Sequence, residues 1–291
     1  MRIDTFHGQE KKMLFWEDGD NSIKAKEYMI RHGLTGIVFS KHLGFTGNII
    51  SMQSNFEFVD EIHIIDSNIK DISFVYHFPN VSIINIQNDD KTKIDFAHFL
   101  CLKDVFLTWR KGVVNLFNNK GLTSLKIEKF KEKSLYLDSN MGLEELWIYS
   151  SPLDDLSSVR NLRNIRSLKL AQLRCLEDVS WIRDMVVLEE MLLISCKKIS
   201  KTVFDNITEL VRIKRIYMEK MGDIPSIQLV EYLKNLEEIS LIDNTRIVDG
   251  NLHSLLGLLN LKKITIQEFK HYRPSVSEIE SNILLSKSPI Q

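Results

Sequence analysis

Cysteine and glycine are both scarce in this sequence of 291 residues. The three cysteines, Cys101, Cys175 and Cys196, are odd in number and far apart. This arrangement argues against a disulfide framework and is typical of a protein in a reducing compartment. The twelve glycines leave little material for a phosphate-cradling loop, and no nucleotide-binding glycine motif occurs. The sequence therefore disfavours a disulfide-stabilised secreted domain and a nucleotide-binding enzyme.

Long hydrophobic runs and an excess of one charge are also absent. No stretch approaches the roughly 18 uninterrupted apolar residues that a membrane span requires. The polar residues 1–8 lack the apolar core of a secretory signal. The net charge is −1 and the pI about 6.7, whereas binding of a nucleic-acid backbone needs a concentrated positive field. We therefore expect a cytoplasmic protein that binds neither nucleic acid nor membrane.

A spaced apolar pattern is what the sequence has in abundance. It consists of an apolar residue, two variable residues, an apolar residue, one variable residue and a third apolar residue. Copies begin 20 to 25 residues apart, at positions 34, 59, 81, 102, 122, 143, 165, 188, 213, 236 and 261. A random apolar chain could imitate one copy, but not eleven in phase. Self-similarity at such a period indicates a solenoid of stacked repeats.

The spacing resembles the leucine-rich-repeat family, whose consensus is L-x-x-L-x-L-x-x-[N/C]-x-L. Its ninth position is kept only in part: Asp89, Cys196, Asn244 and an off-register Asn140 fit, whereas Arg110, Phe130 and Ser151 do not. Segments between copies share an apolar-x-Asp-apolar-Ser core, at 69–73, 153–157 and 176–180. This core is similar to that of the internalin-like bacterial class, whose convex side is formed of short helical turns.

The resemblance implies an α/β leucine-rich-repeat solenoid, with a curved parallel sheet on its concave side and short helices and turns on its convex side. We expect an N-terminal cap over residues 1–33, a solenoid of about eleven repeats over 34–270, and a C-terminal cap and tail over 271–291. Residues 22–32 are predicted to form a helix that Asn21 or Ser22 caps and Gly33 ends. Residues 13–16 are predicted to be a strand or edge cover. From Ile199 onward, i, i+3, i+4 spacing predicts true convex helices.

The variable residues between the apolar ones should project onto the concave face, because strand side chains alternate between the two sides of a sheet. Eleven strands about 4.8 Å apart would give a face about 50 Å long, which is large enough for a protein footprint. Exposed aromatic residues beside cations are typical of interface hot spots. The candidate protein-binding residues are Phe106, Trp109, Lys126, Trp147, Tyr149, Lys169 and Tyr217. An alternative is that some of these aromatic residues only shield neighbouring strands.

Charged doublets occupy the second and third places of several copies. Four are acidic, at 60–61, 144–145, 189–190 and 237–238, and two are basic, at 214–215 and 262–263. One interpretation is a mostly acidic strip that steers a basic partner. The other, which the alternating signs favour, is that the charges keep the sheet soluble.

No residue pattern indicates catalysis or a bound metal. The eight histidines lack the spacing of a zinc site, and His63 is predicted to project from the concave face. Asp89-Asp90 and Asp154-Asp155 lie in predicted turns, where aspartate stabilises the backbone. Cys196 occupies the ladder position of a repeat, where cysteine is an ordinary choice. We expect a protein that is not an enzyme and that uses no cofactor.

These observations predict a non-catalytic protein-binding module that is monomeric when free. The preferred specific hypothesis is a bacterial immunity or inhibitor protein, which sequesters a toxin or effector enzyme through the concave face. The alternative is a regulatory or scaffolding subunit of a cytosolic complex. A surface adhesin is disfavoured by the missing signal and anchor, and a nucleic-acid binder by the net charge.

Overall fold

The computed structural model describes residues 2–6, 10–45, 52, 55–65, 69, 71–88, 91–139 and 141–287. The chain folds into two compact units. The first unit contains Met1–Lys129 and Asn140–Gly142, and the second contains Phe130–Ser139 and Leu143–Gln291. Asp89, Asp90 and Asn140, to which the sequence assigned turn or ladder roles, lie outside the described residues.

The first unit is built on a sheet in the order β1-β2-β3-β4-β5-β7-β9, beside the two-stranded sheet β6-β8. Apart from the antiparallel pair β1–β2, neighbouring strands in both sheets are parallel. Its elements are β1 (Arg2–Thr5), β2 (Lys12–Trp16), α1 (Ser22–His32), β3 (Gly36–Phe39), η1 (Lys41–Leu43), β4 (Glu61–Ile64), η2 (Ser73–His77), β5 (Ile83–Ile86), β6 (Ile94–Asp95), η3 (Phe96–His98), β7 (Asp104–Thr108), β8 (Val113–Val114) and β9 (Ser124–Glu128).

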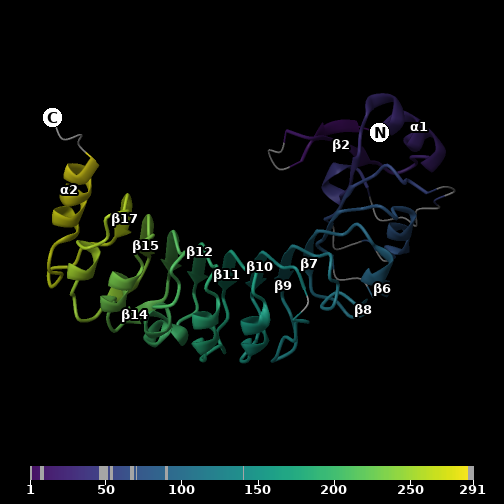
Figure 1. Ribbon diagram of the computed structural model, residues 1–291. Helices are drawn as coiled ribbons and strands as arrows, with labels where there is room; N and C mark the ends of the chain where they lie inside the picture. Colours follow the sequence, from purple (N-terminus) through teal and green to yellow (C-terminus); the bar gives the residue numbers. More distant parts are fainter. Residues whose placement is uncertain are drawn as a thin grey trace. The chain divides into compact units, whose positions relative to one another are not determined.

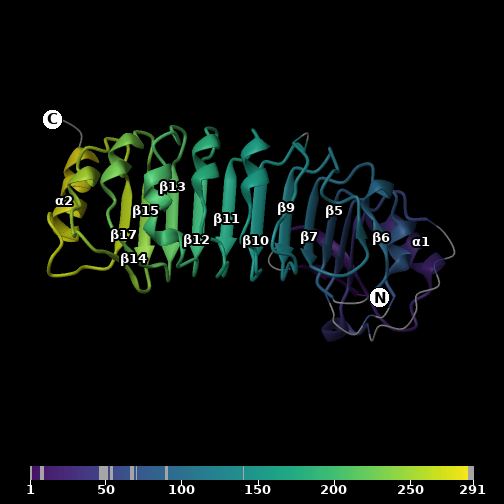
Figure 2. The ribbon, with the colours of Figure 1, turned by 90° about the horizontal axis from the view of Figure 1, so that it is seen from below.

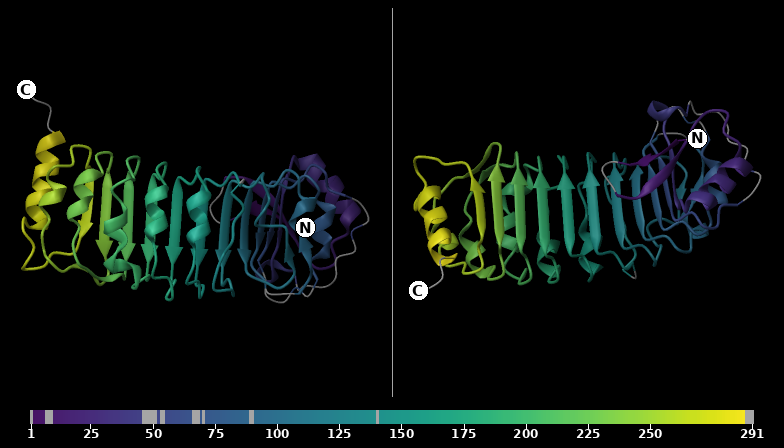
Figure 3. Two further views of the ribbon diagram at one scale, coloured as in Figure 1. Left: turned by 60° about the horizontal axis from the view of Figure 1, so that its bottom comes forward. Right: turned by 90° about the horizontal axis from the view of Figure 1, so that it is seen from above.

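The second unit carries the parallel sheet β10-β11-β12-β13-β15-β17 and the small parallel sheet β14-β16. Its strands lie side by side and run in one direction (Figure 3). Its elements are β10 (Glu145–Tyr149), η4 (Ser157–Asn161), β11 (Ser167–Ala171), η5 (Ser180–Asp184), β12 (Glu190–Ile194), η6 (Ile199–Lys201), η7 (Val203–Asn206), β13 (Arg215–Glu219), β14 (Gly222–Ile224), η8 (Gln228–Tyr232), β15 (Glu238–Ile242), β16 (Thr245–Ile247), η9 (His253–Leu255), β17 (Lys263–Ile266) and α2 (Val276–Lys287).

Every one of the eleven apolar copies in the sequence forms a strand among the described residues. Equivalent residues of successive copies pair in register, as Leu168 does with Met191 and Ile216 with Ile239. Their side chains are fully buried or nearly so, because they face the layer of turns that returns the chain to the next strand. The structure therefore confirms the leucine-rich-repeat solenoid fold.

The convex layer consists of short 3₁₀ turns, which lie across the sheet of the second unit (Figures 1 and 2). The apolar-x-Asp-apolar-Ser core explains how these turns begin. The Asp71, Asp155 and Asp178 carboxylates each accept a hydrogen bond of 2.8 Å from the backbone N–H of the serine two residues later. Asp155 therefore has the turn role that the sequence predicted.

The prediction of true helices on the convex side after Ile199 is wrong. The segments there form the 3₁₀ turns η6, η7, η8 and η9, with i to i+3 hydrogen bonds such as Asp205 N–H to Thr202 O at 3.1 Å. Apolar residues three apart fit a 3₁₀ turn as well as an α-helix. A turn also suits a segment that must reach a parallel strand only about 4.8 Å away. Among the described residues, the α-helices are confined to the ends of the chain.

Two local predictions near the N-terminus, the helix over 22–32 and the strand over 13–16, are confirmed. The helix α1 begins at Asn21, whose Oδ1 accepts hydrogen bonds from the N–H groups of Ile23 and Lys24, and ends at Gly33 with φ 62°. Residues 13–16 belong to β2, which pairs parallel with β3 and antiparallel with β1. In the C-terminal segment, the helix α2 follows Tyr272.

Each strand of the later copies ends in a left-handed residue. The eighth position has a positive φ in six successive copies: Lys129, Ser150, Gln172, Ser195, Lys220 and Asp243. The ninth residue then turns into the interior, and Ser151, for example, accepts a hydrogen bond of 3.1 Å from the Phe130 N–H. Arg110 is also buried and donates to Asn88 at 3.0 Å. Arg110 and Ser151, which depart from the consensus of the ninth position, therefore still make hydrogen bonds to a neighbouring repeat.

Candidate protein-binding faces

We define the concave face of each unit as the side of its sheet opposite the 3₁₀ turns. In the first unit, the N-terminal part of this face is closed. Val38 is fully buried in a cluster with Phe6, Met13 and Phe15. His63, which the sequence placed on the surface, is only 4% exposed, and the Phe6 ring lies 4.3 Å from its ring. Phe6, which follows β1, therefore covers His63 in a region that the sequence predicted to be open.

A buried polar network lies at this closed region. Glu61 accepts a hydrogen bond from Lys11 Nζ at 3.0 Å, and its other carboxylate oxygen lies 2.8 Å from His63 Nε2. The second ring nitrogen of His63 lies 3.2 Å from the Asn85 amide, whose oxygen accepts from Gln87. Burial alone would raise the pKa of the Glu61 carboxyl, but the hydrogen bonds from His63 and Lys11 outweigh it and lower this pKa. The network is structural, since it satisfies every polar group named here.

The open part of the first concave face holds two of the candidate residues side by side. Phe106 on β7 pairs with Lys126 on β9, and the Lys126 ammonium lies 3.6 Å from the Asp104 carboxylate. Trp109 follows the end of β7, and its ring stacks on Phe117 at 5.5 Å with an interplanar angle of 7°. Trp109 therefore belongs to the turn after the strand and not to the row that holds Phe106.

The second concave face is centred on Trp147 of β10. Lys169 pairs with it from β11, and the Lys169 ammonium lies 5.8 Å from the Trp147 ring centre. The same ammonium lies 2.8 Å from the Glu145 carboxylate. Tyr149 is two residues further along β10, where its hydroxyl accepts a hydrogen bond of 3.0 Å from Gln172. These contacts hold the two aromatic side chains in place on the sheet.

The row of Trp147 continues across the unit. Leu192 on β12 follows Lys169, and Tyr217 on β13 follows Leu192. The Tyr217 hydroxyl donates to the Glu219 carboxylate at 2.8 Å, and Lys220 binds the other oxygen of that carboxylate. Burial and the neighbouring Glu219 raise the pKa of Tyr217, so this hydroxyl stays protonated. The structure therefore places Trp147, Tyr149, Lys169 and Tyr217 on one face of one unit.

Ion pairs on the sheet itself neutralise part of the charge of the acidic doublets in the second unit. Glu189 binds Arg166 at 2.6 Å and Lys214 at 2.7 Å, and Glu190 binds Arg215. In the same way, Glu237 binds Lys262 at 2.8 Å. Each of these pairs joins neighbouring strands, because equivalent positions lie side by side in a parallel register. The structure therefore favours the solubility interpretation over a strip that attracts basic partners.

The buried cysteine and the possible metal ligands show no sign of a reactive site among the described residues. Cys196 is fully buried and its Sγ contacts the carbonyl oxygens of Leu170 and Ile194 at 3.5 and 3.4 Å. Within the described residues, no group of three or more histidine, cysteine, aspartate or glutamate side chains could hold a metal ion. None of the helices in that part of the chain has both the length and the apolar character needed to cross a membrane.

No protein-family model matches the sequence, and no match is found among curated proteins. Solved structures similar to this chain include an internalin (inlF) from Listeria monocytogenes, at 16% identity and a TM-score of 0.47, covering 84% of this chain and 85% of that one. A leucine-rich-repeat protein of Leptospira interrogans is 13% identical, with a TM-score of 0.35 and coverage of 81% and 78%. The similarity is one of fold. Fold alone does not carry over what a protein binds.

Two features of these faces escaped prediction from the sequence. The burial of His63 was not predicted, because the repeat pattern contains no information on where a segment outside the repeats packs. The second feature is a group of cations that follow the strands of the second unit, including Arg174, Lys197 and Lys220. A signal for it did exist, since these three residues are spaced 23 positions apart, close to the repeat period.

Proposed function

We propose that the chain binds another protein through the concave face of its second unit. The observation that carries this proposal is the row Trp147, Lys169, Leu192 and Tyr217 on four adjacent strands, with the Lys169 ammonium beside the Trp147 ring. Large aromatic side chains and a cation on a solvent-facing sheet are the composition of an interface core. The strands and the contacts on the sheet already fix these side chains, so little conformational entropy is lost when a partner binds.

The area of this sheet is too small to form one side of a standard protein interface by itself. Six strands about 4.8 Å apart and five residues long give a flat area of about 24 by 16 Å, or roughly half of the ~800 Å² that one side of a standard interface buries. A partner bound to this sheet would therefore also contact the edges beyond it.

Our finer proposal is an immunity or inhibitor protein that sequesters a toxin or effector enzyme. The ordered aromatic row on a solenoid sheet supports binding of another protein. Ion pairs within the sheet weaken the argument for a basic target, so the proposal rests on the aromatic row. The alternative is a regulatory or scaffolding subunit, which would leave its partner active.

A comparison of four baits tests the face directly. The wild-type chain and the variants Trp147→Ala, Tyr217→Ala and Tyr232→Ala are immobilised and incubated with lysate of the source organism, and retained proteins are quantified by mass spectrometry. Tyr232 is the matched control, because it is 52% exposed on η8 on the convex side. We expect one protein to be retained by the wild type and by Tyr232→Ala and lost from the other two.

With that protein purified, each concave variant should weaken the complex by more than about 2 kcal/mol. Circular dichroism of each variant checks that it is folded. Equal binding by all four baits would refute the proposed face. An activity assay of the captured protein then separates the two finer proposals, because only an inhibitor abolishes the activity.

A further inference from the structure

The second unit contains a pocket of about 510 Å³ at the ends of its strands. We call it the basic rim pocket; it is lined by Arg174, Ser195, Lys197, Lys220 and Asn244. These residues follow the strands β11, β12, β13 and β15. They lie in the turns just beyond the concave face and belong to no part of the aromatic row.

The repeat builds this pocket through its left-handed turns. Ser195, Lys220 and Asn244 have φ of 55°, 55° and 59°, so the chain bends sharply after each strand. Neighbouring turns stay in register, because the Ser195 and Lys220 N–H groups bind carbonyl oxygens of the next strand at 2.8 and 3.3 Å. Side chains from four successive repeats therefore line one hollow.

The lining is positively charged. Three of its five residues are cations and none is a carboxylate. Among the described residues, no carboxylate lies within ion-pair distance of Arg174 or Lys197. The Glu177 carboxylate pairs with the neighbouring Lys198 and therefore does not neutralise Lys197.

Lys220 is the partly neutralised member of the set. It lies 2.5 Å from a Glu219 carboxylate oxygen and 3.5 Å from Asp243. Several cations on the sheet of this unit are paired with carboxylates of adjacent strands, as Arg166 and Lys214 are with Glu189. The pocket differs from the sheet because it gathers three cations, two of them without a carboxylate partner among the described residues, around one hollow.

We propose that the basic rim pocket binds a phosphoryl group. A phosphate monoester carries about −1.5 to −2 charges at neutral pH and three strong acceptor oxygens. The Arg174 guanidinium offers a planar pair of donors, which suits such a group, and the Lys197 ammonium is a mobile point charge. The Ser195 hydroxyl and the Asn244 amide add neutral hydrogen-bond donors. A single carboxylate would leave much of this positive charge uncompensated.

The volume indicates that the phosphoryl group is part of a larger ligand, because pockets of roughly 300–1,000 Å³ hold molecules of drug size. The group could be attached to a small phosphate ester or to a phosphorylated side chain of a protein. Both sources share the chemistry proposed here, so the experiment uses a probe for each.

Isothermal titration at constant ionic strength tests the pocket. The probes are O-phosphoserine, as the free ester, and the pentapeptide Ala-Ala-phosphoserine-Ala-Ala; unphosphorylated serine and the unphosphorylated peptide are controls. We expect saturable binding of one phosphoryl probe per chain with a Kd below about 1 mM, and none of the controls. Tighter binding of the peptide by tenfold or more would identify a protein source, and equal or weaker binding a small ester.

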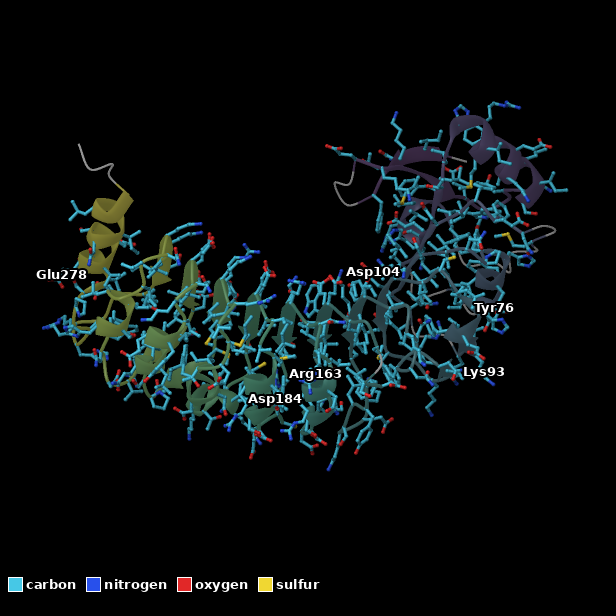
Figure 4. The ribbon with its side chains drawn as sticks, in the orientation of Figure 1. Tyr76, Lys93, Asp104, Arg163, Asp184 and Glu278 are labelled. Atoms are coloured by element: carbon cyan, nitrogen blue, oxygen red, sulfur yellow. The ribbon has the colours of Figure 1, made fainter. Side chains whose placement is uncertain are left out.

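Two double variants that change the net charge equally separate the pocket from a general charge effect. Arg174→Gln with Lys197→Gln should lower the affinity at least tenfold. Arg163→Gln with Lys234→Gln should lower it less than twofold, since both residues are exposed and precede strands, at the end opposite the pocket. Figure 4 shows Arg163 on the side of the second unit that carries the 3₁₀ turns.

The proposal is overturned if no phosphoryl probe saturates the chain up to about 10 mM, or if both double variants lose affinity equally. The outcome does not depend on the aromatic row, because Trp147→Ala is expected to bind the probes normally. Titration with the phosphoryl probes tests the pocket, and capture by the concave-face variants tests the proposed function, so either proposal can be refuted without the other.

Discussion

At the scale of single residues, buried polar groups are the sites where this chain is most sensitive. The carboxylate of Glu61 is 4% exposed and is held by Lys11 and His63. Removing one partner of a buried charged network is costly because the remaining groups keep their desolvation penalty. Cys196 and Ser151 are buried in a similar way, at equivalent places of two repeats.

Glu61→Gln should lower the free energy of unfolding of the first unit by about 1–3 kcal/mol at neutral pH. The folded-state pKa of Glu61 lies below its ordinary value of 4.5. Its stabilising contribution is therefore complete above that value and is lost as the pH falls through the lowered pKa. Urea unfolding of both proteins at several pH values checks this, and the difference between them should shrink in acid.

Asp60→Asn is the matched control for Glu61→Gln. Asp60 binds the same ammonium of Lys11 at 2.6 Å, but its side chain is 50% exposed. We expect a loss below about 1 kcal/mol, as for exposed ion pairs. Equal losses in the two variants would show that burial of Glu61 is not the deciding factor.

The three thiols should differ in reactivity. Burial raises the pKa of Cys196 to about 11, whereas Cys101 and Cys175 are exposed. Only the thiolate reacts with an alkylating agent. Iodoacetamide at mildly alkaline pH should therefore modify two thiols of the native chain, and the third only after addition of urea. Peptide mass spectrometry identifies the sites, and rapid modification of Cys196 in the native chain would contradict the buried ladder position.

At the scale of elements, the strand and the turn after it form the unit of construction. The left-handed eighth residue lets the ninth side chain point inward, where it binds backbone groups of the neighbouring repeat. Non-glycine residues tolerate this conformation at a modest cost, which the hydrogen bonds of the ladder offset. A partly degenerate ninth position is therefore compatible with a regular ladder.

Ser151→Ala should destabilise the second unit by about 1–3 kcal/mol, because the buried Phe130 N–H loses its acceptor. Ser151→Cys should lose less, since Cys196 occupies the same place in another repeat. The control Ser167→Ala removes only a weak contact to Glu190 at 3.5 Å and should cost less than about 0.5 kcal/mol. Urea unfolding ranks the three variants, and a different order would refute the proposed role.

At the scale of the whole molecule, charge is compensated locally and the net charge is only −1. Ion pairs between adjacent strands weaken the field that the acidic doublets would otherwise create. Long-range steering of a partner by the second sheet should therefore be weak.

The complex with the captured partner should accordingly respond little to salt. Between about 0.05 M and about 0.5 M sodium chloride, we expect Kd to change by less than tenfold, because apolar contacts are not screened. Surface plasmon resonance over this range measures it. A steep loss of affinity would restore the charged doublets as the main determinant of binding.

The sequence by itself determined the solenoid, the positions of the eleven strands and the helix over 22–32. Each depends on a local period or on a capping residue such as Asn21, and both are visible without knowledge of distant contacts. The row that contains Trp147 and Tyr217 could be read for the same reason, because residues alternate across a strand.

Only the tertiary structure decided which parts of that row are open and where charge is left uncompensated. His63 is buried because Phe6 packs against its ring, a contact between residues that no repeat relates. Glu189 is neutralised because residues from different repeats lie side by side. Arg174 and Lys197 meet in one pocket because successive turns are stacked in register. These outcomes depend on distances between segments, and a linear pattern does not contain such distances.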